Sequence, residues 1–344
     1  MPSLLRFFAK DLGIDLGTGN TIISDANGNI LVNEPSVVAI DLTTYEILAV
    51  GIEAKNMLGK TPGNIMAVRP LDNGVIADFE LTQAMLTFFV KKANSIFSVF
   101  QPKAVITVPS FLTDVEKRSV EDVVIYAGCR DALLIEENIA AAIGMGLDIN
   151  EPRGHLISNI GAGTIQSSII SLAGVVSSKA VKYGGDNVDR DIRNYIKKNH
   201  NLLVGNSTCE YIKNAICTLK NENLHRTTIV SGKDLVTGMP KTIELAAESL
   251  LDCVVPLVNE TISSIRDVLE KTPPEISREI LMDGIILCGG VSSLDGLAEA
   301  IEENLEIKTN ISKNPINLTG VGVGKAIKIL SKKATLLIGK KDER

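Results

Sequence analysis

The sequence has no tryptophan and little histidine, and its cysteines follow no regular spacing. Its three histidines are His155, His200 and His225, and its five cysteines are scattered without a CxxC pair. We therefore expect no zinc site, since such a site needs several of these ligands at close spacing. Isolated thiols also fit a reducing compartment better than a disulfide framework.

Long apolar runs and an excess of positive charge are missing too. No apolar run reaches the roughly 18–20 residues of a membrane-spanning helix, and the short, interrupted apolar start does not predict a signal peptide. The net charge of −6 argues against a nucleic-acid partner held by bulk charge. The 344 residues, 45% of them hydrophobic, suffice for two domains with proper cores.

Two glycine-rich segments in different halves of the chain share one pattern: strand, tight turn with hydroxyls, strand. The first, residues 11–23, contains Gly17-Thr18-Gly19, and the second, residues 156–170, contains Gly161-Ala162-Gly163-Thr164. Turns of this kind point successive backbone N–H groups into one small space, which suits phosphate oxygens. Either turn alone could be ordinary geometry. Together they predict a duplicated fold that clamps phosphates between its halves.

Two further glycine pairs stand where a predicted strand leads into a helix. Gly289-Gly290 ends a buried strand, and we expect Ser292 or Ser293 to cap the helix that follows. Gly184-Gly185 lies between the second hairpin and a helix. A helix N-terminus favours an anion, so either pair could approach a phosphate or a nucleoside. Both could also be ordinary turns.

Charged residues supply the remaining candidates. Glu210 and Lys213 share one face of a predicted helix, where they could reach a ribose or a base, or form a solvated salt pair. Glu136 and Glu137 stand where a strand becomes a helix. A carboxylate there could orient an attacking water, or merely complement the helix dipole. Residues 320–326 are glycine-rich and contain the Gly-Lys pair of a P-loop, but alanine follows the lysine and no strand leads in, so we expect no P-loop.

The order of these motifs resembles that of the actin–Hsp70–sugar-kinase superfamily and, within it, the MreB family of bacterial actins. The resemblance covers residues 10–330 and is also carried by Asn33–Val37, Glu53–Met57, Gly74–Asp78, Leu134–Glu137, Ala140–Gly144 and Lys271–Glu275. It implies an α/β protein with an actin-like duplicated ATPase fold, in which each of two domains carries a small inserted subdomain. The four expected subdomains are IA (1–32 and 73–145), IB (33–72), IIA (146–182 and 250–344) and IIB (183–249).

The resemblance also implies a site for ATP or ADP with Mg²⁺ in the central cleft. Asp15 and Asn159 would face the metal, and Glu137 and Thr164 would position the attacking water as catalytic residues of a weak ATPase at most. The implied cofactor-binding residues are Gly17, Thr18, Gly19, Asn20, Gly161, Ala162, Gly163, Gly185, Glu210, Lys213, Gly289 and Gly290.

The chain departs from the family pattern near this site. The family has Asp at Asn159, and a small polar residue followed by an acid at Ile165 and Gln166. Asn159 removes one negative charge beside a metal that favours carboxylates. Because phosphoryl transfer depends on positioning and electrostatics, we expect hydrolysis to be slower by a factor on the order of 10²–10³, with binding less affected. Other departures are Asn138 for Pro, Ala215 for Glu and Val291 for Gly.

Two apolar segments suggest contact with a membrane surface. A helix over residues 1–10 would place Arg6 and Lys10 opposite an apolar face, although this segment could also pack on the core or fray. The second segment matches a hydrophobic loop of the family. The predicted membrane residues are Leu4, Leu5, Phe7, Phe8, Ile96 and Phe97. Weak anchors become strong when many act on one polymer.

The resemblance predicts an ATP-binding bacterial actin that forms homopolymer filaments, or co-polymers with paralogues. It would be cytoplasmic, peripheral at the inner face of the cell membrane, and serve cell shape or motility. The alternative is an actin-fold small-molecule kinase with Glu137 as the base, although no other substrate-pocket signature is visible. A chaperone of the Hsp70 kind would need a peptide-binding domain after the ATPase fold, which we do not expect because the chain ends at Arg344.

Overall fold

The computed structural model describes residues 11–94 and 101–332. The predicted membrane residues Leu4, Leu5, Phe7, Phe8, Ile96 and Phe97 lie outside these ranges. Among the helices of the described part of the chain, none is both long enough and apolar enough to cross a membrane.

The first half begins with five consecutive strands, and helices then separate the later strands. Its elements are β1 (Leu12–Leu16), β2 (Asn20–Ser24), β3 (Ile30–Pro35), β4 (Val38–Asp41), β5 (Ile47–Val50), α1 (Ile52–Met57), β6 (Ile65–Val68), β7 (Leu71–Asp72), β8 (Val75–Ile76), α2 (Phe79–Ala93), β9 (Lys103–Val108), α3 (Asp114–Tyr126), β10 (Asp131–Glu136) and α4 (Glu137–Met145). Thr113 caps α3 and forms a capping box with Glu116.

The second half also combines strands with helices, and the segment inserted into it is longer. Its elements are β11 (His155–Ile160), β12 (Ile165–Ser171), β13 (Gly174–Val181), α5 (Gly185–His200), β14 (Leu202–Leu203), α6 (Asn206–Ile216), η2 (Asn221–Asn223), β15 (Thr227–Asp234), β16 (Pro240–Ala246), η3 (Ala247–Leu250), α7 (Leu251–Leu269), α8 (Pro274–Asp283), β17 (Ile285–Cys288), η4 (Gly290–Ser293), α9 (Leu297–Leu305), β18 (Thr309–Ile311) and α10 (Leu318–Lys332).

One expected helix start is wrong. Neither Ser292 nor Ser293 caps α9, because residues 290–293 form the short 3₁₀ helix η4 and α9 begins only after Gly296. The Ser292 hydroxyl instead donates a hydrogen bond to the carbonyl oxygen of Gly289 at 2.7 Å. The glycine pair thus leads into a tight turn that bends the chain back beside β17.

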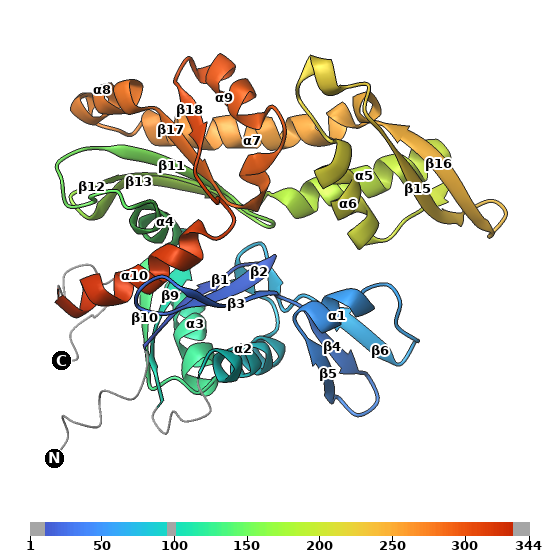
Figure 1. Cartoon of the computed structure of the whole chain (residues 1–344), viewed down its shortest axis with the longest axis horizontal. Coiled ribbons are helices and arrows are strands. Elements are labelled where there is room, and N and C mark those ends of the chain that lie inside the picture. Colours follow the sequence, from blue (N-terminus) through green and yellow to red (C-terminus); the bar gives the residue numbers. More distant parts are fainter. Residues whose placement is uncertain (1–10, 95–100, 333–344) are drawn as a thin grey trace.

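Two five-stranded sheets repeat one topology. Their strand orders are β3-β2-β1-β9-β10 and β13-β12-β11-β17-β18. In each sheet the first three strands form an antiparallel meander, and the last two run parallel to the first strand of that meander in the chain. The same order in both halves confirms the predicted duplication, and Figure 1 shows the two sheets one above the other.

Each half also carries a small separate sheet. Strands β5-β4-β6 lie with α1 between β3 and β7, and strands β14-β15-β16 lie with α5 and α6 between β13 and α7. In Figure 1 both small sheets stand on the same side of the molecule, one in each half. We call residues 33–72 the first insert and residues 183–249 the second insert.

Helices α4 and α10 form a shared layer between the two large sheets. One buried cluster contains Ile139 of α4 and Ile327 of α10 together with Val105 of the first sheet and Ile157 of the second. The glycine run at 320–324 lies inside α10, where it lets backbones approach closely. A Cβ on Gly322 would collide with the carbonyl oxygen of Ala140 in α4. These glycines therefore serve helix packing.

Candidate functional site

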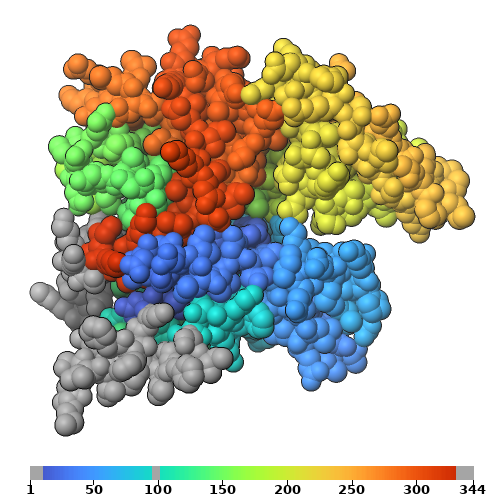
Figure 2. Space-filling model, in the orientation of Figure 1, coloured from blue at the N-terminus to red at the C-terminus, as the bar shows by residue number. Residues whose placement is uncertain are grey.

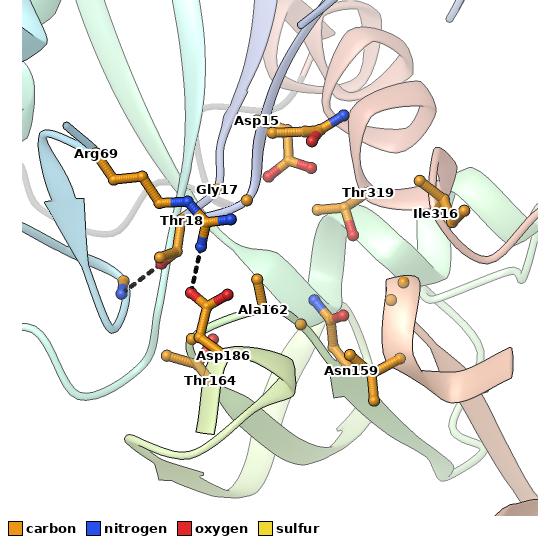
Figure 3. A pocket seen from close by; sticks show the side chains of 18 of the residues that line it. Asp15, Gly17, Thr18, Arg69, Asn159, Ala162, Thr164, Asp186, Ile316 and Thr319 are labelled. Atoms are coloured by element: carbon orange, nitrogen blue, oxygen red, sulfur yellow. Dashed lines mark hydrogen bonds and ion pairs between the residues drawn. The ribbon is translucent and has the colours of Figure 1, made fainter. Parts of the chain in front are cut away.

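A cavity of about 400 Å³ lies between the two halves. Residues from both large sheets and both inserts line it, and Figure 3 shows Asp15 and Asn159 reaching it from opposite halves. All the predicted catalytic, metal and cofactor residues except Gly185 line its wall: Asp15, Gly17, Thr18, Gly19, Asn20, Glu137, Asn159, Gly161, Ala162, Gly163, Thr164, Glu210, Lys213, Gly289 and Gly290. The fold thus brings the predicted site together, while the role of each residue stays a prediction.

The two glycine turns are closed by equivalent hydrogen bonds and face each other. The backbone N–H of Gly17 donates to the carbonyl of Asn20 at 3.1 Å, and that of Gly161 donates to the carbonyl of Thr164 at 2.8 Å. A Cβ on Gly163 would lie only 2.8 Å from the hydroxyl oxygen of Thr18. This close approach explains why glycine is needed at position 163. Both turns line the same cavity, so one ligand could contact both.

Thr18 is held from a third segment. Its hydroxyl oxygen accepts a hydrogen bond from the backbone N–H of Gly74 at 2.9 Å. Gly74 has a positive φ of 77° in the turn between β7 and β8, a conformation that favours glycine. The turn at residues 17–20 is therefore held both by its own hairpin and by Gly74, which follows the first insert.

A half-buried carboxylate, Asp15, and a buried one, Glu137, lie beside these turns, near the carboxyl ends of β1 and β10. Asp15, in β1, accepts a hydrogen bond from the Thr107 hydroxyl at 2.8 Å, but burial raises its pKa to about 6. Glu137 begins α4, and burial, reinforced by Asp15 and Glu136, raises its pKa to about 8. Both charged forms are unfavourable as the site stands. A bound cation would relieve that cost, so this end of the cavity favours one.

The donor set suits magnesium only if water and phosphate complete its coordination. In residues 11–94 and 101–332, no three His, Cys, Asp or Glu side chains converge on a metal position. Magnesium usually keeps several waters and binds one or two carboxylates plus substrate phosphates. Asp15 fits that role beside the two turns.

Asn159 is the counterpart of Asp15 in the second sheet. Asp15 pairs with Ile22 across its hairpin, and Asn159 pairs with Gln166 across the other. The Asn159 side-chain amide N lies 3.5 Å from a carboxylate oxygen of Glu137, which accepts from it. A neutral amide, not a second carboxylate, therefore lies against Glu137 from the second half.

Glu210 and Lys213 do not form the solvated salt pair that the sequence left open. The buried Lys213 ammonium donates to the carbonyl of Gly185 at 3.0 Å and to Asp189 at 2.9 Å. Burial raises the pKa of Asp189 to about 6, although Lys213 opposes that rise. Glu210 instead pairs with Lys55 of the first insert. Gly185 thus supports the wall through its carbonyl without lining the cavity.

Two departures from the family pattern join the halves through buried hydrogen bonds. The Asn138 amide in α4 donates to the Gln166 carbonyl at 2.9 Å and to the Ser168 hydroxyl at 3.0 Å. The Gln166 side-chain oxygen accepts from the backbone N–H of Ser110, which follows β9, at 3.1 Å. Gln166 thus keeps an acceptor without a charge. Proline could not make the contacts of Asn138.

Several residues that line the cavity were not among the site residues predicted from the sequence. Lys55 and Arg69 come from the first insert, Asp186 and Asp189 from the start of α5, and Thr319 from α10. Asp186 directly follows the Gly184-Gly185 pair, a signal that could have included it. Nothing in the local sequence singles out Lys55 or Arg69, because their places depend on how the inserts meet.

Two sheets of one topology around a shared cavity, each with an insert, define an actin-like α/β fold. The chain belongs to the MreB/Mbl family, whose model, described as MreB/Mbl protein, matches residues 9–335. It is similar to the cell shape-determining protein Mbl of Bacillus subtilis, with 39% identity over 92% of this chain and 95% of that one. It is equally similar to the cell shape-determining protein MreB of Escherichia coli, with 39% identity over 94% of each chain.

Solved structures agree with the family assignment. The crystal structure of MreB5 of Spiroplasma citri bound to AMPPNP matches with a TM-score of 0.87 and 31% identity, over 94% of this chain and 96% of that chain. The ADP-bound structure of the same protein matches equally well. The predicted actin-like fold and family are thereby confirmed, and this chain is a homologue of cell shape-determining proteins.

Proposed function

We propose that this chain binds ATP and ADP, with Mg²⁺, in the cavity between its halves. The facing glycine turns carry the proposal, because turns of this kind suit phosphate oxygens and two copies of the same hairpin line one cavity. The binding of AMPPNP and ADP by the similar MreB5 supports it. A volume of about 400 Å³ is also within the range of small-molecule sites.

The cavity offers a place for each part of the nucleotide. The turns at 17–20 and 161–164 would hold phosphate oxygens, and Asp15 would hold Mg²⁺ through its waters. A Cβ on Gly290 would meet nothing within 4 Å, which leaves open space for a nucleoside. Bound Mg²⁺ would offset the negative charge of the phosphates.

We further propose that hydrolysis in this chain is slow. Glu137 and Thr164 line the cavity where they could orient a water, but a carboxyl with a pKa near 8 is mostly protonated at neutral pH and a poor base until a cation arrives. Asn159 supplies one negative charge less than an aspartate would for that cation. Slow hydrolysis would prolong the ATP-bound state and stabilise filaments, or make the chain depend on an active paralogue.

The family membership supports a cytoskeletal role over the small-molecule kinase. We propose that the chain polymerises, alone or with paralogues, into filaments at the inner face of the cell membrane. There it would serve cell shape or motility. Its role in the cell would then lie in the lifetime and position of the polymer.

Sedimentation and nucleotide binding test this function together. Purified full-length protein should bind fluorescent mant-ATP in the presence of Mg²⁺, and should pellet as filaments above a critical concentration. Gly163→Val should abolish nucleotide binding, because the new side chain would run into Thr18 and Asn73. Gly63→Val is the control, since a Cβ there meets nothing within 4 Å. Wild-type protein that neither binds mant-ATP nor pellets would refute the proposal.

A further inference from the structure

Two ion pairs link the inserts beside the cavity. Lys55 of α1 reaches both carboxylate oxygens of Glu210 in α6 at 3.0 Å. Arg69, just after β6, lies with Nη1 2.5 Å from a carboxylate oxygen of Asp186 in the first turn of α5. All four residues line the cavity wall, and Figure 3 shows the Arg69–Asp186 contact at its edge.

Both pairs are partly shielded from water. The Arg69 and Asp186 side chains are 28% and 34% exposed, and those of Lys55 and Glu210 are 29% and 33% exposed. Partial burial makes a charge pair stronger and less screened by salt than a fully exposed one. Each pair can therefore contribute measurably to holding the inserts together.

The pairs cross the boundary between the two halves of the molecule. In Figure 2 the surfaces of the first insert (light blue) and the second insert (yellow) face each other across a furrow. Lys55 and Arg69 belong to one side, and Glu210 and Asp186 to the other. Any motion that parts the inserts must break both pairs, whereas contacts within each half can stay intact.

We propose that Arg69 and Lys55 are positioning residues that hold the inserts together over bound nucleotide and thereby slow its release. They act through Asp186 and Glu210 and need no contact with the ligand. This inference rests on the proposed function, because it presupposes a nucleotide in the cavity. The two charge pairs that join the halves would then set how long a nucleotide stays bound.

A charge swap at the Arg69–Asp186 pair tests the inference. Release of mant-ATP from full-length protein is followed after mixing with excess ATP. Arg69→Glu and Asp186→Arg should each speed release by about tenfold, since each sets like charges face to face. The double variant restores opposite charges and should return to within about threefold of wild type. Should Arg69→Glu fail to fold, as judged by thermal melting, Arg69→Met takes its place and should still speed release.

Controls separate this role from general stability. Arg153→Glu breaks a more exposed guanidinium–carboxylate pair with Asp283, which lies within the second half and away from the cavity, and should leave release unchanged. Added salt should speed release from wild type more than from the double variant Lys55→Met/Arg69→Met. Release at the wild-type rate from the single variants, or no recovery in the swap, overturns the inference. A wild type that binds no mant-ATP would instead refute the proposed function.

Discussion

Glu137 is held in a state that depends strongly on pH. Its pKa rises from 4.5 to about 8, first through burial and then through the charges of Asp15 and Glu136. Between these values the folded protein keeps a proton that the unfolded chain has released. The folded state therefore binds more protons in this window, and its stability falls as pH rises through it.

Replacing this carboxyl should flatten the pH dependence. In nucleotide-free protein, we expect the free energy of unfolding to decline from about pH 4.5 to about pH 8, and Glu137→Gln to remove most of that decline. Asp15, with a pKa raised from 3.8 to about 6, adds a smaller decline at lower pH that persists in the variant. Urea unfolding at several pH values measures this. The exposed Glu46→Gln is the control, and an unchanged slope in Glu137→Gln would show that burial does not hold the proton.

At the scale of elements, the close contact between α4 and α10 depends on glycines, which have no side chain to keep the backbones apart. Gly144 of α4 and Gly322 of α10 each leave room for a backbone carbonyl of the other helix, those of Leu318 and Ala140. Gly324 similarly sits on β1, where a Cβ on Gly13 would lie 2.5 Å from its backbone N. The shared layer that joins the two halves is thus a backbone-to-backbone contact.

A single methyl group at this contact should be costly. We expect Gly322→Ala to lower the free energy of unfolding by about 1–3 kcal/mol, because the Ala140 carbonyl must move to admit it. Gly63→Ala, whose Cβ would meet nothing within 4 Å, should change stability by less than about 0.5 kcal/mol. Chemical denaturation of the two variants compares them. Equal stabilities would mean that α4 and α10 can shift apart without loss.

Individual strands and turns could be predicted from the local sequence pattern. The contacts between distant elements could not. The paired hairpins at 17–20 and 161–164 follow from a few adjacent residues, which is why they could be predicted from the sequence. The predicted start of α9 is wrong because residues 290–293 form η4, in which the Ser292 hydroxyl donates to the Gly289 carbonyl, and α9 begins only after Gly296. The partners of Lys55 and Arg69 depend on contacts over more than a hundred residues, which no local pattern records.

At the scale of the whole molecule, the proposed membrane contact can be separated from filament assembly. Full-length filaments should co-sediment with anionic liposomes. Removal of residues 1–9 together with Ile96→Ser and Phe97→Ser should abolish co-sedimentation, because many weak apolar anchors on one polymer are lost at once. The variant should still form filaments in solution. If it still binds liposomes as wild type does, these residues are not the anchor.

The most direct measurement is phosphate release from the purified protein with Mg-ATP, beside Asn159→Asp, with ATP binding measured separately for both. A restored carboxylate would supply the missing charge for Mg²⁺ opposite Asp15. We predict that wild type binds ATP but releases almost no phosphate, and that the variant is faster by a factor on the order of 10²–10³. Rapid phosphate release by wild type, or no gain in the variant, would contradict the account and mark the chain as an ordinary dynamic member of its family.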